Sequence, residues 1–349
     1  MVKCNRLGPV ALALILSGKT LCQQPGGKEI PGPKYWIATQ VENGRAQWFD
    51  KLNNIRISNI SDTRSIVKFN FNPGLLFSGT PQKFNLHNVV PNTVFSVFYP
   101  NRHNTGNTDS IYSIRFNGTR LQKLQNASFI AGTGSPSSYS PNFIVNNDVV
   151  WSTSMKPVAA WFASPSLQRS DPPAGNDRET QLTIGLNGYC PEMLIYEQTL
   201  SDTAAWKVNT YFSIKYGLTQ DRSYLGTDNT ILWNKDKYNL FHHRVSAIGS
   251  DPQGALIQFK SNTTYEELDA SDPLKYCSFE NSSHDVDRSE AENVSSPRRN
   301  LTMGFDTKEQ EHMPDRKFLF WGDNNTPVAQ TATVNYASGQ IMVTGRNGS

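Results

Sequence analysis

The segment from Pro191 to Gly217 constrains the fold of this chain most, because it combines a strand, a turn and a helix in close succession. Met193-Leu-Ile-Tyr196 is too short for a helix and is rich in residues that favour strands. Ser201 can accept a hydrogen bond from a first-turn N–H, and Gly217 can adopt the left-handed conformation that ends helices. The sequence therefore predicts a buried strand followed by one helix over residues 201–216.

The predicted helix is expected to be amphipathic, with one face packed against another part of the protein. Asp202 places a negative charge at the positive end of the helix dipole. The residues at the i, i+3, i+4, i+7 and i+8 spacing of one face are mostly apolar or aromatic. They are Val208, Tyr211, Phe212, Lys215 and Tyr216.

The composition favours an extracellular, loop-rich, mainly β protein. Of the 349 residues, 37% are hydrophobic and 11% aromatic, which is enough to build hydrophobic cores. The length of the chain is typical of two domains. Only 18% are charged, below the usual quarter, and Asn, Ser, Thr, Gly and Pro fill the difference. A net charge of +3 gives no reason to expect nucleic acid or an anionic membrane as a partner.

The first residues resemble a secretory signal peptide over residues 1–22. Lys3 and Arg6 precede a short apolar core from Val10 to Leu16, and cleavage is expected between Cys22 and Gln23. A lipid anchor on Cys22 and a disordered cytosolic start are the alternatives. No other segment approaches the roughly 18–20 apolar residues of a membrane span, so we expect a secreted or surface protein without one. The Pro/Gly-rich residues 23–33 are expected to form a flexible lead-in.

Two cysteines would remain after removal of the signal peptide. In an exported protein, Cys190 and Cys277 could form one disulfide across the junction of two modules. Two separate buried thiols are the alternative. The spacings of a CxxC pair or of a Cys/His metal site are absent from the sequence.

Short strand patterns separated by turn residues predict a sandwich or jelly roll over residues 34–200. The predicted strands cover residues 35–38, 66–71, 74–77, 93–99, 111–116, 142–145, 158–162, 181–185 and 193–196. Residues 201–349 are expected to comprise the helix and a second β-rich module, with strands at 230–233, 245–249, 255–259, 317–322 and within 331–343. The polar, charged residues 269–300 are expected to form a long loop.

These patterns resemble a known superfamily. Leu75-Leu-Phe-Ser-Gly79, Thr93 to Tyr99 and Glu192-Met-Leu-Ile-Tyr196 are similar to the concanavalin A-like (laminin-G, lectin/glucanase) jelly roll. Ala247-Ile-Gly-Ser-Asp251 and Phe318-Leu-Phe-Trp-Gly322 resemble an uncharacterised domain that follows such sandwiches. That domain occurs in surface proteins of gliding Gram-negative bacteria, often exported by the type IX route. The superfold hosts many functions, so the resemblance implies a fold more than an activity.

Three aromatic residues are candidates for ligand binding, because their π faces could stack on sugar rings as in lectins. They are Tyr139, Trp151 and Trp161. Packing in the core or at its rim is the alternative for each of them.

The sequence gives little support for catalysis or for a metal. The nearest match to a glucanase carboxylate pair is Glu267-Leu-Asp269-Ala-Ser-Asp272, which lies beyond the predicted sandwich. Glu192 is a single carboxylate, for which a structural hydrogen-bonding role is expected. Asp285-Val-Asp287-Arg-Ser-Glu290 could supply oxygen ligands for Ca²⁺ but lacks the glycine and length of an EF-hand. His242 and His243 are adjacent and would point to opposite faces of a strand, which favours surface or turn roles.

The sequence thus predicts a non-catalytic extracellular or cell-surface binding or adhesion module, with glycans or other surface proteins as partners and no cofactor. A structural spacer without its own ligand is the first alternative, and a glycan-cleaving hydrolase is the second.

Overall fold

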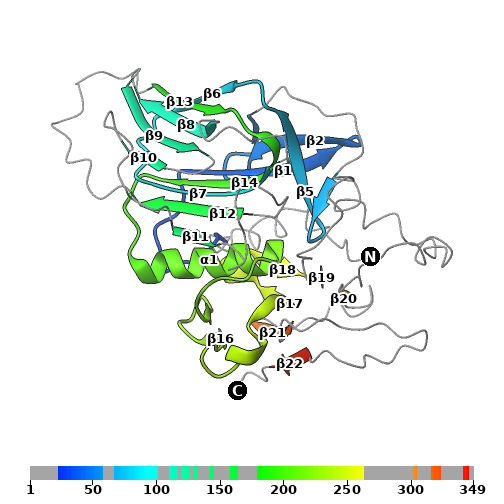
Figure 1. Cartoon of the computed structure of the whole chain (residues 1–349). Coiled ribbons are helices and arrows are strands. Elements are labelled where there is room, and N and C mark those ends of the chain that lie inside the picture. The colour runs from blue at the N-terminus through cyan, green and yellow to red at the C-terminus, as the bar shows by residue number, and fades with distance from the viewer. Residues whose placement is uncertain are drawn as a thin grey trace, which may run out of the picture.

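The computed structural model describes residues 23–57, 67–100, 110–116, 119–125, 129–131, 142–144, 158–163, 179–262, 302–304, 316–323 and 341–345. These residues form a mainly β protein with antiparallel sheets and one α-helix, as the composition predicts. Figure 1 shows two sheets at one end of the molecule, the helix α1 beneath them, and a further sheet on the other side of the helix.

The N-terminal part is a sandwich of two antiparallel sheets. The larger sheet has the order β11-β12-β7-β14-β1-β2-β3, with β5 paired to β14 and β4 to β5. Its strands are β1 (Tyr35–Glu42), β2 (Arg45–Asp50), β3 (Ile55–Arg56), β4 (Val67–Phe69), β5 (Asn72–Ser78), β7 (Thr93–Pro100), β11 (Asn142–Ile144), β12 (Val158–Ala163) and β14 (Asn187–Tyr196). The smaller sheet has the order β10-β9-β8-β13-β6. Its strands are β6 (Gln82–His87), β8 (Ser110–Phe116), β9 (Thr119–Gln125), β10 (Phe129–Ala131) and β13 (Glu179–Ile184).

The space between these sheets holds the first hydrophobic core. Strand β6 shows how the sequence builds it, because Phe84 and Leu86 are buried while the residues between and beside them are more exposed. This alternation is the period of a strand that has one face in a core. Trp48 from β2 and Tyr112 from β8 meet in the same core from the two sheets. The sandwich prediction is therefore confirmed, whereas the finer jelly-roll topology is not established by this strand order.

The C-terminal part contains smaller antiparallel sheets. The main one has the order β18-β17-β21-β22, and β15-β16 and β19-β20 form two-stranded pairs. The elements are β15 (Tyr224–Leu225), β16 (Ile231–Trp233), η1 (Asn239–Phe241), β17 (His243–Asp251), η2 (Pro252–Gly254), β18 (Leu256–Gln258), β19 (Lys260–Asn262), β20 (Thr302–Gly304), β21 (Lys317–Asp323) and β22 (Ile341–Gly345).

Helix α1 (Asp202–Tyr216) begins and ends where the sequence predicts. The Ser201 side chain accepts a hydrogen bond from the Ala204 N–H, and Gly217 takes the left-handed conformation at φ 66° and ψ 37°. The expectation of an amphipathic helix is wrong. Eleven of its residues are buried, and they include polar ones such as Asn209 and Thr210. The helix is buried on more than one face because it lies between two β layers.

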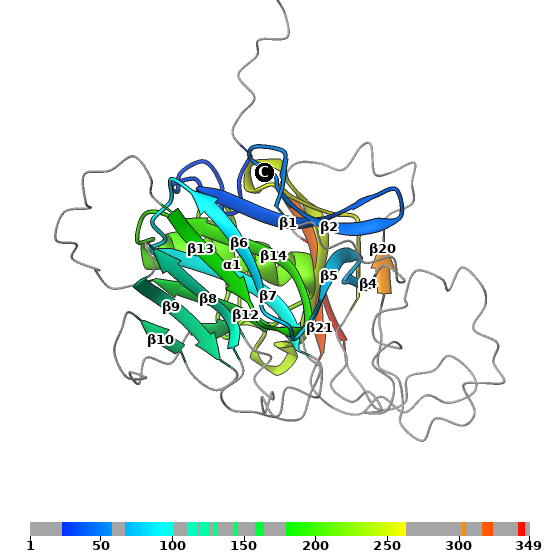
Figure 2. The ribbon, with the colours of Figure 1, turned by 90° about the horizontal axis from the view of Figure 1, so that it is seen from above.

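A second hydrophobic core surrounds α1 and crosses the predicted boundary between residues 200 and 201. It joins Phe95 and Leu194 of the sandwich to Phe212 of the helix, and continues to Val245 and Phe320 of the C-terminal sheet. Figure 2 shows α1 lying across the sheet that contains β7 and β14, on the side away from β6 and β8. The larger sheet therefore has a core on each face, and the helix is a layer shared by the two parts.

Residues 23–33 are not the flexible lead-in that the sequence analysis expected. Gln24 and Ile30 are buried, and the Gln24 amide donates hydrogen bonds to the carbonyls of Gly27 and Ile30. The Lys207 ammonium of α1 lies 3.2 Å from the Glu29 carboxylate. Local hydrogen bonds and this ion pair fix the segment against the helix before the chain enters β1.

Candidate functional site

A hollow of about 620 Å³ lies where the sandwich, the end of α1 and the C-terminal part meet. Its lining comes from the chain start, β1, the turn after β2, β5, α1, and the η2–β18 region. The lining residues are Gln23, Trp36, Ala38, Thr39, Gln40, Lys51, Asn72, Pro73, Lys215, Tyr216, Pro252, Ala255 and Ile257. Two lysines and several amide and hydroxyl side chains give it a polar, basic character.

Lys51 is held in this hollow by the turn that follows β2. The buried Asp50 carboxylate accepts hydrogen bonds from the backbone N–H groups of Trp36 and Leu52 and from the Asn53 side chain. The Lys51 N–H donates to the Trp36 carbonyl, and the Lys51 ammonium lies 4.2 Å from the centre of the Trp36 ring. The turn thus places a cation over an aromatic face, a favourable contact for a partly desolvated ammonium.

Behind the hollow lies the carboxylate of Glu192, which is fully buried. It reaches this position because the β14–β7 register shifts between Tyr189 and Glu192, as at a β-bulge, with Pro191 inside the irregularity. Cys190 faces the core between the two sheets, whereas Glu192 contacts α1, although the two residues are two apart and would share a face in a regular strand. The bulge therefore turns the carboxylate toward the helix.

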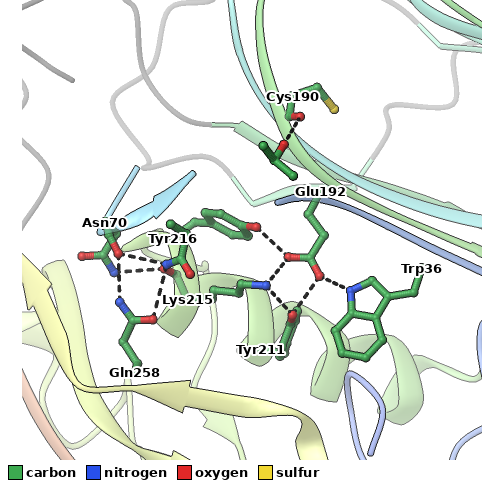
Figure 3. A network of polar contacts seen from close by, with 10 residues as sticks. Trp36, Asn70, Cys190, Glu192, Tyr211, Lys215, Tyr216 and Gln258 are labelled. Atoms are coloured by element: carbon green, nitrogen blue, oxygen red, sulfur yellow. Dashed lines mark hydrogen bonds and ion pairs between the residues drawn. The ribbon is translucent and has the colours of Figure 1, made fainter. Parts of the chain in front are cut away.

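Glu192 accepts hydrogen bonds from four donors (Figure 3). Oε1 accepts from the Trp36 indole N–H and, at 2.8 Å, from the Tyr211 hydroxyl. Oε2 accepts from the Lys215 ammonium and the Tyr216 hydroxyl, each at 2.6 Å. An ionised carboxylate offers about four lone-pair sites, so this one is fully occupied. This supports the structural hydrogen-bonding role expected from the sequence.

The charged groups beside the hollow shift the pKa values of Glu192 and Lys51. Burial would raise the pKa of Glu192, but the charges of Lys215 and Lys51 and hydrogen bonds from Lys215 and Tyr216 oppose it, and the pKa falls below its ordinary value. Burial lowers the pKa of Lys51, the Lys215 charge lowers it further, and Glu192 acts in the opposite direction. Glu192 is thus kept ionised, while Lys51 is a cation that lacks full compensation.

The rim of the hollow is fixed by a two-residue turn between β4 and β5. Asn70 and Phe71 both have positive φ values, 47° and 68°, and connect the register pair Phe69–Asn72, as in a type I′ turn. Figure 3 shows Asn70 beside Lys215 and Gln258. The Asn70 amide donates to the carbonyls of Ile214 and Lys215, and the Asn72 amide also donates to the Lys215 carbonyl. These amides satisfy carbonyls that the end of α1 leaves without intrahelical partners.

This turn also binds the C-terminal part of the chain. The Gln258 amide donates to the Asn70 carbonyl, and the Ser261 hydroxyl donates to the Asn70 side-chain oxygen. The Lys260 ammonium lies 4.6 Å from the centre of the Phe71 ring. A positive φ is unfavourable for a bulky residue such as Phe71, so these contacts hold the turn in a conformation that it would not adopt alone.

Of the aromatic residues predicted to bind a ligand, the structure describes the strand position of one. Trp161 lies on β12, in register with Asn142 of β11 and Phe95 of β7. Tyr139 and Trp151 lie outside the described residues. The sequence analysis did not identify Trp36 and Lys51 as candidate site residues. The only sequence feature that relates them is that they lie on either side of the Asn43-Gly44 hairpin turn.

Cys190 is buried, has no disulfide partner among the described residues, and has a thiol pKa that burial raises. Its predicted partner Cys277 lies outside the described residues, so the disulfide stays a prediction.

The remaining candidates do not form a metal or catalytic site in the described part of the chain. No group of three or more His, Cys, Asp or Glu residues suited to a metal occurs among the described residues. His242 is buried, not on the surface as expected, and its Nδ1 accepts from the Trp233 indole at 2.9 Å while Nε2 lies 2.8 Å from the Gln220 carbonyl. The carboxylates of the glucanase-like segment 267–272 and of the Ca²⁺ candidate 285–290 lie outside the described residues, as does the predicted loop 269–300.

Comparison with known families identifies one part of the chain. A family model described as a domain of unknown function (DUF8202) matches residues 205–347, which agrees with the expected uncharacterised second module. No concanavalin A-like family matches the N-terminal region. Searches of curated proteins and of solved structures gave no match. None of the described helices combines the length and apolarity that crossing a bilayer requires.

Proposed function

We propose that this chain is a non-catalytic binding module of the cell surface or extracellular space, and that it binds glycans in the hollow at the junction of its two parts. The observation that carries the proposal is the hollow itself, a space of about 620 Å³ with polar side chains held by rigid neighbours. Pre-formed pockets with a few fixed polar groups are typical of ligand sites. A concanavalin A-like jelly roll would fit the two-sheet sandwich and this role.

Several features support binding over hydrolysis. Glycoside hydrolysis uses two carboxyl groups, one as acid and one as base or nucleophile. The Glu192 carboxylate lies behind the hollow, and its oxygens already accept from Trp36, Tyr211, Lys215 and Tyr216. No aspartate or glutamate occurs among the described residues that line the hollow. The described lining therefore offers donors and cations to a ligand but no free carboxylate base.

A glycan array probed with the purified chain tests the proposal, in Ca²⁺ and in EDTA. We expect a saturable hit that is lost in Gln40→Trp, because Gln40 is a half-buried lining residue whose enlargement would fill the hollow. Gln198→Trp is the matched control, since Gln198 is exposed and does not line the hollow. No binding by the wild-type chain in either condition would refute the proposal.

The array also tests the aromatic residues predicted from the sequence. Loss of binding in Trp151→Ala or Trp161→Ala, with binding unchanged in Gln40→Trp, would move the glycan site from the hollow to that part of the sandwich. Loss in EDTA alone would add a cation to the site.

A structural spacer is the second candidate, and the continuous core around α1 favours it. A core that joins the sandwich to the C-terminal sheet makes the two parts one rigid body, which is what a spacer in a surface protein needs. In that case the array would give no hit, and the chain would unfold in one cooperative transition.

A further inference from the structure

We propose that the hollow selects acidic saccharides, with the carboxylate of a sugar acid paired to Lys51. This inference rests on the proposed function, because it names the ligand class of the same site. It follows from the charges of the hollow, from the position of Lys51, and from what covers the Trp36 ring.

One positive charge of the hollow has no ion-pair partner among the described residues. Lys215 is paired with Glu192 at 2.6 Å, and its side chain is only 15% exposed, so its charge is compensated within the protein. The Lys51 side chain reaches solvent although the surrounding protein partly desolvates its ammonium, and it forms no ion pair with any carboxylate in the described part of the chain. Because none of the described residues that line the hollow is acidic, its described lining has a net positive charge.

The surroundings of Lys51 make an anion more favourable there than at an ordinary surface lysine. Its pKa is lowered by burial and by Lys215, so its ammonium form is at a disadvantage that a bound carboxylate would remove. The turn held by Asp50 limits the positions that the side chain can take. A charge-assisted hydrogen bond to a carboxylate is roughly twice as strong as one between neutral groups.

The hollow is poorly built for neutral sugars that rely on stacking. Trp36 is the only tryptophan among the lining residues that the structure describes, and the Lys51 ammonium lies 4.2 Å from the centre of its ring. Its edge N–H is engaged with Glu192, and Tyr211 lies against it in a T-shaped contact with centroids 6.4 Å apart. Recognition must therefore depend mainly on the charge of Lys51 and on polar contacts from Gln23, Gln40 and Thr39.

The test is a calorimetric titration of the full chain with acidic saccharides and their uncharged counterparts. The probes are tetragalacturonate, an alginate tetramer and 3′-sialyllactose, each paired with its methyl ester, which keeps the sugar and removes the charge. We expect at least one acid to bind, with an affinity about tenfold or more above that of its ester. The acid that binds distinguishes uronic acid chains from sialylated glycans.

Three variants locate the effect. Lys51→Gln is expected to lose the preference for the acid, and Lys51→Arg to keep most of it. Lys237→Gln is the matched control, because the Lys237 ammonium also lies over an aromatic ring, 5.2 Å from the centre of Tyr238, but Lys237 does not line the hollow. Equal melting temperatures of Lys51→Gln and the wild-type chain would show that folding is intact.

The outcomes separate this inference from the proposed function. If a glycan binds in the hollow, as shown by its loss in Gln40→Trp, but the ester binds as tightly as the acid, the acidic selectivity is wrong and the glycan-binding role stands. An unchanged preference in Lys51→Gln would also refute the assignment of Lys51. If the array and the titrations show no glycan binding at all, both proposals fail.

Discussion

Replacing Glu192 by glutamine should destabilise the protein strongly, although the two side chains have almost the same size. Each orientation of the amide places its N–H2 group against a donor that cannot accept a hydrogen bond. With the nitrogen in place of Oε1 it meets the Trp36 indole, and in place of Oε2 it meets the Lys215 ammonium. In both cases Lys215 loses its only ion-pair partner in the described structure.

The magnitude follows from the burial of this pair. Removing one partner of a buried ion pair costs about 3–5 kcal/mol, because the other charge is left uncompensated. Lys215 has a side chain that is 15% exposed and could turn toward the hollow, which favours the lower end of that range. At about 2–4 °C per kcal/mol, the melting temperature should fall by roughly 6–15 °C.

Thermal unfolding followed by circular dichroism measures this shift, with Asp221→Asn as the control. Asp221 also pairs with a lysine, Lys235, at 2.5 Å, but its side chain is 72% exposed, so its loss should cost less than about 1 kcal/mol. The double variant Glu192→Gln/Lys215→Met should recover part of the loss, because it removes the orphaned charge. The reasoning is refuted if Glu192→Gln is no less stable than Asp221→Asn.

Further predictions concern pH, the helix ends and the buried thiol. The pKa of Glu192 is lower in the folded than in the unfolded chain. Its contribution to stability is therefore complete above the ordinary carboxylate pKa, about 4.3, and is lost as the pH falls below that value. Urea unfolding across this pH range should show that the free energy of unfolding falls less on acidification in Glu192→Gln than in the wild type. Ser201→Ala removes the hydrogen bond from the Ala204 N–H and should cost about 1 kcal/mol in urea unfolding, whereas Ser201→Thr, which keeps a hydroxyl at the cap, should be near neutral. Gly217→Ala should cost about 1–2 kcal/mol because alanine is disfavoured at φ 66°, and a cost near zero would contradict that argument. Cys190 should resist alkylation in the native protein and react in denaturant without reductant; no reaction there would favour the disulfide with Cys277 over the free thiol.

The ends of the helix and most strands could be predicted from the sequence because their signals are local. A serine hydroxyl and a left-handed glycine act within one turn of the chain, so Ser201 and Gly217 sufficed. The β1–β2 hairpin could also have been found, since Asn43-Gly44 is a strong two-residue turn signal and both residues have positive φ. It was missed because Arg45–Asp50 mixes charged and aromatic residues, and the burial of Ala46 and Trp48 depends on the core between the two sheets.

The site could not be predicted in the same way, because its geometry depends on partners far apart in the chain. Periodicity assigned one apolar face to the helix, but it cannot show that the polar residues Asn209 and Thr210 are buried as well. The side of the sheet that Glu192 faces is set by an irregularity in β14 that only the pairing with β7 reveals. Lys51 became a candidate only when the turn after β2 placed it over Trp36.

The shared helix has a consequence for how this protein can be divided. The matching family segment starts at residue 205, one turn inside α1, so a fragment cut there would lose the Ser201 cap and expose the side chains that now face Phe95 and Leu194. A sandwich fragment ending at residue 200 would expose the opposite side of the same contact. The family match gives the boundary of the segment that is inherited as a unit, whereas the contact around α1 shows which segments must fold together. In this chain the two boundaries differ. Recombination that separates the halves at residue 205 should therefore yield two pieces that aggregate.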